Sequence, residues 1–314
     1  MALVKKIKGG KPTRTKTRRT REHDEDEDIR HITLPTQKIQ VPKELSSYSI
    51  CLFGEKGIGK TSLIGQFPNH LNIQFDPRRV NVSLRQLPGP DDKPLTWAAF
   101  RKIVELIQNR QESGRMTVGV DIVYRAYELC LLWVCQQIDK SITHPQQMND
   151  YGKTWKDVET EFENQLGLIS QADCQLITIA HAAYKEVPLR TGSNYELLVP
   201  QASKGVWGYL RAMDYVFYYG YSGRQRILQV RGDDFTWASA GVENTYLDPK
   251  GREVRRYKMP NTAKEAYRVL IDGFHNRKYG MREEEELQDE VDNTEGDTRP
   301  KKATKKVRKT FKKR

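Results

Sequence analysis

The feature that most constrains this chain is a glycine-rich loop at residues 54–61, placed between an apolar run and a helix-forming segment. Its sequence, GEKGIGKT, fills every fixed position of the phosphate-binding pattern G-x-x-x-x-G-K-[ST]. Residues 49–53 are apolar and suit a strand that is covered on both faces. The pattern and its context together predict a loop that binds nucleotide phosphates, rather than a glycine turn that binds nothing.

The roles expected within this loop follow from its chemistry. Glycines adopt backbone conformations that other residues avoid, so consecutive amide groups can turn towards a phosphate. Lys60 is expected to place its ammonium group between the β- and γ-phosphates of ATP, and Thr61 to offer its hydroxyl group to Mg²⁺. The predicted nucleotide-binding residues are Gly54, Glu55, Lys56, Gly57, Ile58, Gly59, Lys60, Thr61 and Ser62.

Composition narrows the class of protein. Of the 314 residues, 37% are hydrophobic and 30% are charged, so a sizeable core is possible, although not from the whole chain. A run of about 18 apolar residues and a secretory signal are both lacking. We therefore expect a cytoplasmic protein without a membrane span. The cysteines lack metal-binding spacing, which predicts buried, reduced thiols at Cys51, Cys130, Cys135 and Cys174.

The two ends of the sequence are highly charged. Residues 1–30 are basic and then acidic, and residues 281–314 are acidic and then basic, with ten basic residues between Arg299 and Arg314. Both segments lack apolar periodicity, so we predict disordered tails around a globular domain at residues 31–280. The formal net charge of +12 favours a nucleic-acid partner, with solvated tails as the alternative. The acidic blocks are expected to mask the basic ones when nucleic acid is absent.

Between the tails, strand-like and helix-like segments alternate. This pattern predicts an α/β fold with a mainly parallel sheet and helices on both faces. The expected strands are residues 49–53, 71–75, 116–120, 175–180, 197–200, 215–219 and 226–230. The expected helices are residues 61–67, 96–114, 122–139, 151–169 and 203–213.

Two residues that follow predicted strands are candidates for the same site. Asp121 follows the strand at residues 116–120, where a carboxylate beside the phosphate loop can hold magnesium; the alternative is a helix N-cap. His181 follows the strand at residues 175–180 and can sense the γ-phosphate or position water; the alternative is a histidine that binds only neighbouring backbone. Ligands of open α/β sheets bind at this carboxyl edge.

Five ordered blocks of sequence resemble a known family. They are FGEKGIGKTSLIGQFP, VDIVYRAYELC, YGKTWKDVETEFENQL, ITIAHAAYKE and VPQASKGVWGYLRAMDYVFYY, within residues 47–219. In this order they resemble phage-borne AAA-domain nucleotide-binding proteins, which have a RecA-like P-loop NTPase core and include ATPases of single-strand annealing and recombination. The resemblance implies ATP and Mg²⁺ as cofactors, the host cytoplasm as location, and Lys60, Asp121 and His181 as active-site residues.

The resemblance also raises expectations that spacing alone does not. RecA-like ATPases often carry a glutamate after the second strand to activate water, and here Asp76 occupies that place. An aspartate is one methylene shorter, and a simple Asp-Pro turn is the alternative. The family further implies a homo-oligomer with ATP near the subunit interface. Arginine fingers acting across that interface are possible at Arg211, Arg224 and Arg226.

These observations favour an ATPase that acts on single-stranded DNA in recombination, annealing or replication. The alternatives are a nucleotide-switched nucleic-acid-binding protein with little hydrolysis, or a small-molecule kinase. A GTPase is disfavoured because a fitting N-K-x-D segment is missing. Trp207 and Tyr209, interleaved with Lys204 and Arg211, are candidates for stacking on bases, although a core role for Trp207 is favoured.

Overall fold

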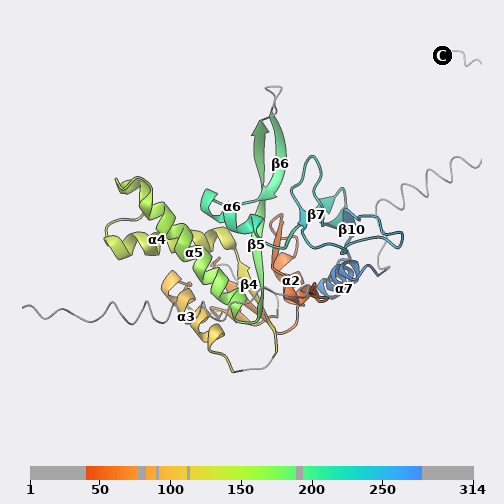
Figure 1. Ribbon diagram of the computed structural model, residues 1–314, viewed down its shortest axis with the longest axis horizontal. Coiled ribbons are helices and arrows are strands. Elements are labelled where there is room, and N and C mark those ends of the chain that lie inside the picture. Colours follow the sequence, from red (N-terminus) through yellow and green to blue (C-terminus); the bar gives the residue numbers. More distant parts are fainter. Residues whose placement is uncertain (1–39, 77–82, 90–91, 112–113, 189–193, 278–314) are drawn as a thin grey trace, which may run out of the picture. The chain divides into compact units, whose positions relative to one another are not determined.

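The computed structural model describes residues 40–76, 83–89, 92–111, 114–188 and 194–277 (Figure 1). The chain divides into two compact units, Met1–Pro42 and Lys43–Arg314. Of the first unit only residues 40–42 are described, so the elements below all belong to the second. The tails predicted at residues 1–30 and 281–314 lie outside the described residues.

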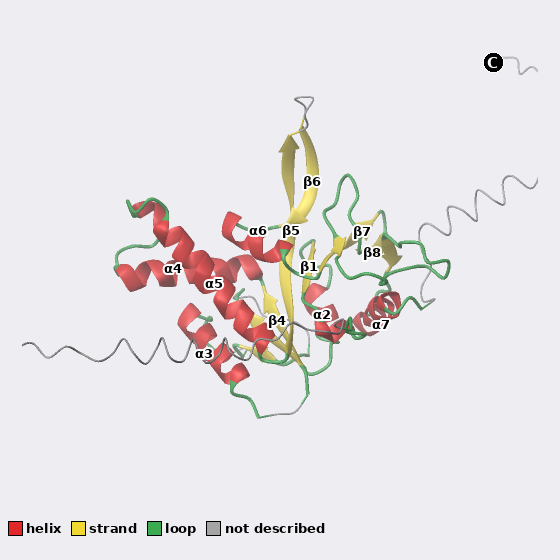
Figure 2. Ribbon diagram, in the orientation of Figure 1, coloured by secondary structure: helices red, strands yellow, loops and turns green. Residues whose placement is uncertain are grey.

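A mainly parallel sheet forms the centre of this unit (Figure 2). Its strand order is β10-β8-β7-β1-β5-β4-β2-β3, and all neighbours from β7 to β3 pair in parallel. This confirms the predicted α/β class. The parallel strands are β1 (Ile50–Gly54), β2 (His70–Gln74), β3 (Gln86–Leu87), β4 (Met116–Asp121), β5 (Cys174–Pro188) and β7 (Tyr215–Ser222).

Helices cover both faces of the sheet, as predicted. Side chains of β1 alternate between two hydrophobic clusters, with Cys51 and Phe53 in one and Ile50 and Leu52 in the other. The first cluster packs against α3 (Trp97–Gln108), α4 (Val123–Ile138), α5 (Lys153–Gln171) and α6 (Lys204–Arg211). The second packs against the short helices η1 (Leu45–Ser47) and α2 (Lys60–Ile64), and against α7 (Ala263–Phe274).

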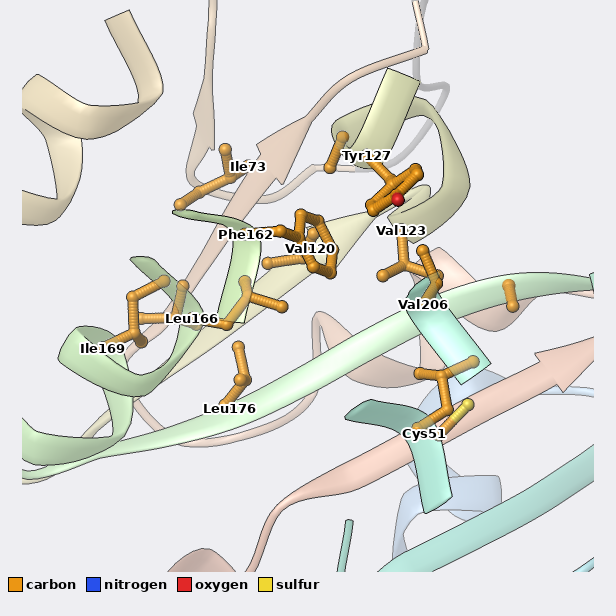
Figure 3. Packing of buried hydrophobic residues seen from close by; sticks show 14 of the residues in the cluster. Cys51, Ile73, Val120, Val123, Tyr127, Phe162, Leu166, Ile169, Leu176 and Val206 are labelled. Carbon is orange, nitrogen blue, oxygen red and sulfur yellow. The ribbon is translucent and has the colours of Figure 1, made fainter. Parts of the chain in front are cut away.

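Buried hydrophobic residues of the larger cluster pack these helices against the sheet (Figure 3). Phe162 of α5 is fully buried and its ring lies 5.2 Å from that of Tyr127 of α4, edge to face. Such aromatic pairs add about 1 kcal/mol to the stabilisation that burial gives. A second 3-10 turn, η2 (Pro145–Gln147), connects α4 to α5.

Threonine side chains cap the N-termini of two helices. The Thr96 hydroxyl accepts a hydrogen bond from the Ala99 amide at 3.2 Å and caps α3, as the sequence predicts. Thr262 caps α7 in the same way, through the Glu265 amide at 3.3 Å. Helix α2 ends at Ile64, earlier than the predicted residue 67.

Strand β5 is longer than predicted. It was expected to end before His181, but it continues to Pro188. From Ala182 onwards it pairs antiparallel with β6 (Asn194–Pro200), and the two strands form a hairpin (Figure 2). Tyr184 and Val187 favour this extension, because aromatic and β-branched residues suit strands. His181 is therefore in the middle of a strand.

The remaining strands extend the sheet in antiparallel fashion. They are β8 (Gln225–Gln229), β9 (Ser239–Ala240) and β10 (Arg256–Lys258). The sequence predicts β8 within one residue at each end, whereas β3, β9, β10 and α7 are not among the predicted elements. All four cysteines are buried and unbridged, as expected. Within the described ranges, every helix is too short or too polar to cross a membrane.

Candidate nucleotide-binding site

The phosphate loop follows β1 at the carboxyl edge of the parallel strands. Gly57 and Gly59 have φ angles of 82° and 104°, in the left-handed region that favours glycine. Gly54 is needed for another reason, because a Cβ atom at this position would collide with the carbonyl oxygen of Tyr219 on the neighbouring strand β7. The three glycines therefore give the loop its turn and its close fit to the sheet.

Lys60 turns back into this loop. The residue is only 6% exposed, and its ammonium group donates hydrogen bonds to the carbonyl oxygens of Gly54 at 2.8 Å and Glu55 at 2.7 Å. A buried ammonium group requires such partners. The loop thus holds a positive charge at the position expected for a lysine that binds phosphate oxygens.

Thr61 and Asp121 meet at the same edge. The Thr61 hydroxyl group of α2 donates a hydrogen bond to Asp121 Oδ2 of β4 at 2.7 Å. A hydroxyl and a carboxylate oxygen are hard ligands of the kind that Mg²⁺ prefers. Residues 60 positions apart in the chain therefore form a donor set that fits the expected cofactor, and the Asp121–Ile122 peptide bond that follows is cis.

Asp76 lies just beyond β2 at the same edge. Gln74 is aligned with Asp121, and the Phe75 amide donates to the Asp121 carbonyl oxygen at 2.6 Å. The Gln74 side chain also donates to the backbone carbonyl of Asp76 at 3.2 Å. The structure thus brings the predicted water-activating residue near Asp121, with its main chain held by Gln74.

His181 is brought next to the loop through strand pairing. It is aligned with Gly54 across the β1–β5 ladder, and its half-buried ring lies 6.3 Å from that of Tyr124 on α4. Its carbonyl oxygen accepts a hydrogen bond from the Gln201 amide at 2.7 Å, beyond the end of β6. The position agrees with a sensor of the γ-phosphate, although the role itself stays a prediction.

Tyr218 of β7 is a site residue that the sequence did not reveal. Its hydroxyl group donates to Glu55 Oε1 at 3.4 Å, and burial raises the pKa of Tyr218 to about 12. A neutral phenol therefore holds the second residue of the loop. The two residues are 163 positions apart, so local sequence carries no signal of this contact.

A buried polar row runs along β2 towards Asp76. His70, Asn72 and Gln74 are all buried, and the Asn72 amide group donates to Gln74 Oε1 at 2.9 Å. Among the described residues, neither ring nitrogen of His70 nor Oδ1 of Asn72 has a hydrogen-bond partner. Burial, helped by the positive charge of Arg85, lowers the pKa of His70 to about 4. The sequence analysis did not predict this row, because polar residues that alternate with apolar ones are typical of a solvent-exposed face, whereas both faces of β2 are buried.

The residues predicted as arginine fingers or as stacking partners of bases lie in different environments. Arg226 donates to the Asn261 carbonyl at 3.0 Å and lies over the ring of Tyr219, so it is bound within its own chain. Arg224 is exposed in the turn between β7 and β8. Tyr209 packs against Phe162, with ring centroids 6.3 Å apart, and is directed into the core instead of towards bases. Burial also raises its pKa.

Comparison with known proteins shows the family of this chain. The sequence model of a family described as "AAA domain" matches residues 46–238. The SPbeta prophage-derived uncharacterized protein YorG of Bacillus subtilis is 28% identical over 147 residues, which are 46% of this chain and 43% of YorG. This chain therefore matches less than half the length of that relative.

Among solved structures, a KaiC-like protein from the hyperthermophilic archaeon Pyrococcus horikoshii is similar, with a TM-score of 0.39 and 9% sequence identity over 70% of this chain and 88% of that one. The family match decides the family, since it spans more than half of the 314 residues. It includes the phosphate loop, Asp76, Asp121 and His181. The chain belongs to the AAA domain family and carries the phosphate loop of a P-loop NTPase.

Proposed function

We propose that the protein is an ATPase that acts on single-stranded DNA in phage recombination, annealing or replication. The observation that carries the enzymatic part is the convergence of buried Lys60 with the Thr61–Asp121 pair at one sheet edge. This arrangement provides an ammonium group for phosphate oxygens and two oxygen ligands for a divalent cation. It supports ATP and Mg²⁺ as cofactors.

Catalysis at this edge would consist mainly of positioning and charge stabilisation. The loop amides and Lys60 would hold the phosphates, and Asp76 would orient the attacking water. His181, next to Gly54 in the ladder, would contact the γ-phosphate side of the site. Thr61 and Asp121 would hold magnesium, and the chemistry supplied by the bound ion would be neutralisation of phosphate charge.

The nucleic-acid part of the proposal has two supports. The first is the formal net charge of +12, with basic segments near both ends of the sequence. The second is the prophage origin of a relative that shares 28% identity over 147 residues. A phage protein of this kind would work in the cytoplasm of the host cell. Both supports are consistent with the single-stranded DNA partner that we propose.

We further propose that the protein assembles with copies of itself and places ATP near the subunit interface. Arg224 is the candidate for a cation supplied to a neighbouring subunit, because it is exposed in the β7–β8 turn. Arg226 is instead bound within its own chain.

Two arginine variants test this proposal. Arg224→Ala is expected to slow hydrolysis while nucleotide affinity is retained, whereas Arg226→Ala is expected to reduce the stability of the fold. Equal nucleotide hydrolysis by the wild type and Arg224→Ala would exclude Arg224.

The decisive experiment measures ATP hydrolysis with and without single-stranded DNA at two salt concentrations. DNA stimulation that weakens at high salt, and that Lys60→Ala abolishes, is the expected result. ATP binding without any effect of DNA would overturn the DNA-dependent part of the proposal. Absence of nucleotide binding by the wild-type protein would overturn all of it.

A nucleotide switch with little hydrolysis is the second candidate, and Asp76 favours it. Its side chain is one methylene shorter than glutamate, while Gln74 fixes its backbone. Asp76→Glu separates the two functions. Faster hydrolysis in this variant would favour the switch as the native function, whereas slower hydrolysis would show that the site is built for the shorter acid.

A further inference from the structure

A pocket of about 310 Å³ lies at the hairpin formed by β5 and β6, away from the phosphate loop. It is bounded by this hairpin, by α6 and by residue 237 of the segment that follows β8. Its volume is at the lower end of the range for small-ligand pockets, which suits a single planar group. The residues that matter for its chemistry are Lys185, Val187, Leu197, Trp207, Arg211 and Trp237.

Two tryptophans give the pocket its aromatic surface. The rings of Trp207 and Trp237 lie 5.1 Å apart at an interplanar angle of 42°, and both residues are half-buried. The main chain around Trp237 is fixed to β6, because the Trp237 amide donates to the Leu198 carbonyl at 2.9 Å. Neighbouring Phe235 is 71% exposed. Aromatic groups are thus presented near the solvent by a rigid backbone.

Positive charge surrounds this aromatic surface. The Lys185 ammonium group lies 4.8 Å from the ring centroid of Trp207, and the Arg211 guanidinium carbon lies 5.7 Å from it. Both basic residues are exposed, and Glu186 is the acidic residue among those lining the pocket. Two cations against one carboxylate favour an anionic ligand, while the indole rings favour a flat one.

We propose that this pocket binds one base of a single-stranded nucleic acid, with Trp207 and Trp237 contacting the base and Lys185 and Arg211 binding the flanking phosphates. This inference rests on the proposed function, since it names the site at which the nucleic acid is held. Stacking on aromatic side chains combined with basic residues that follow the backbone is how single strands are bound without sequence preference.

The pocket and the nucleotide site share one strand. His181 is aligned with Gly54 of the phosphate loop, and Lys185 is four residues further along β5. Side chains alternate along a strand, so His181 and Lys185 project from the same face of β5. The Gln201 amide also ties the end of β6 to the His181 carbonyl at 2.7 Å. Under this proposal β5 would contact both the nucleotide and the bound base. A change at one site could therefore reach the other along this strand, which would explain the stimulation of ATP hydrolysis by DNA.

The test is the affinity of the full-length protein for fluorescent oligo(dT) and oligo(U), measured by anisotropy. Trp207→Ala and Trp237→Ala are each expected to weaken binding about tenfold, whereas Trp207→Phe keeps an aromatic face and most of the affinity. Trp133→Ala is the matched control, because Trp133 also carries an arginine, Arg101, at 4.7 Å from its ring but does not line the pocket. ATP affinity, measured separately, is expected to stay unchanged in all four variants.

Salt dependence tests the role of the cations. Lys185→Ala and Arg211→Ala should each reduce the slope of log affinity against log salt by about 0.7, as expected for one phosphate contact to a single strand. Tighter binding of oligo(dT) than of oligo(U) identifies DNA as the ligand, and the reverse identifies RNA. Either result supports a site that holds single-stranded nucleic acid.

The failures can be told apart. If the wild-type protein binds neither oligonucleotide, both the nucleic-acid part of the proposed function and this inference are overturned. If the wild type binds and the tryptophan variants bind equally well, only the pocket is excluded. If Trp207→Ala changes the oligomer mass and leaves the affinity for oligonucleotide intact, the pocket is an interface between copies of the chain, which also overturns the inference.

Discussion

Two groups of buried polar side chains, both near the parallel strands, are held in opposite ways. At the phosphate loop, Lys60 donates to two carbonyl oxygens, and Thr61 donates to Asp121 at 2.7 Å. Along β2, both ring nitrogens of His70 and one amide oxygen of Asn72 lack partners among the described residues. The first group is satisfied and charged, whereas the second is incompletely satisfied and neutral.

The polar atoms along β2 that have no partner within the described part of the chain are expected to lower the stability of the fold. An unsatisfied buried polar group costs about 1–3 kcal/mol, while a paired one costs little. Lys60→Ala removes the ammonium partner of two loop carbonyl oxygens, so it is expected to lower stability as well as activity. Removing these ring nitrogens of His70 on β2 is expected to raise stability instead. Four predictions test this contrast, in order of decreasing effect.

Lys60→Ala is expected to reduce ATP hydrolysis about a thousandfold, equivalent to roughly 4 kcal/mol, because it removes a positive group that binds the transferred phosphate. Steady-state hydrolysis and nucleotide affinity measure the loss. Lys140→Ala, at an exposed lysine beyond the end of α4, is the control and should retain full activity. A similar loss in both variants would mean that the loss does not come from the phosphate loop.

Acid is expected to destabilise the fold through His70. The pKa of this histidine is lowered to about 4 in the folded protein, so the unfolded chain binds a proton first as the pH falls below about 6.5. The fold is therefore not affected by this titration above about pH 6.5, and it loses up to about 3 kcal/mol of stability as the pH falls towards 4. Urea unfolding of wild type and His70→Leu at several pH values checks this; parallel pH profiles would contradict it.

Asp121→Asn is expected to weaken magnesium binding about a hundredfold, since the carboxylate charge is lost while an oxygen remains to accept the Thr61 hydrogen bond. The Mg²⁺ concentration that gives half-maximal ATP hydrolysis measures this effect. Asp76→Asn is the matched variant at the same sheet edge, and it should lower the rate without changing the Mg²⁺ requirement. An unchanged requirement in Asp121→Asn would remove this residue from the metal site.

His70→Leu is expected to raise stability at pH 7 by about 1 kcal/mol, the smallest of the four effects. It removes two buried nitrogens without partners among the described residues, and puts an apolar side chain of comparable size in place of the ring. Thermal or urea unfolding gives the difference. A loss of about 2 kcal/mol or more would show that the ring has a packing role, which would remove the contrast between the two groups.

Much of the parallel half of the sheet could be predicted from the sequence, because its signals are local. The glycine loop, the apolar run before it and the acid after residues 116–120 each lie within a few residues of the strand they mark. These signals predicted β1 and β4 to within one residue at each end. The structure brings Thr61 and Asp121 into contact, and their roles at magnesium stay predictions. Helix capping by Thr96 was predictable for the same reason.

The other half depends on contacts between distant residues. Strands β9 and β10 are two and three residues long, so they exist only through pairing with β7 and β8. The extension of β5 beyond His181 requires β6 as its partner. The pairing of Tyr218 with Glu55, and of Trp207 with Trp237, likewise arises only when the strands and α6 are assembled.

The length of β5 has a mechanical consequence. Its first part, up to His181, pairs with β1 and β4, whereas the part from Ala182 to Pro188 pairs with β6 in the hairpin. At about 3.3 Å per residue, this part forms a lever arm of roughly 23 Å. A tilt of about 5° at His181 would therefore move the far end by about 2 Å, on the geometry of an extended strand. A small tilt of β5 beside the phosphate loop would thus move the end of the hairpin far enough to make or break a contact with a ligand.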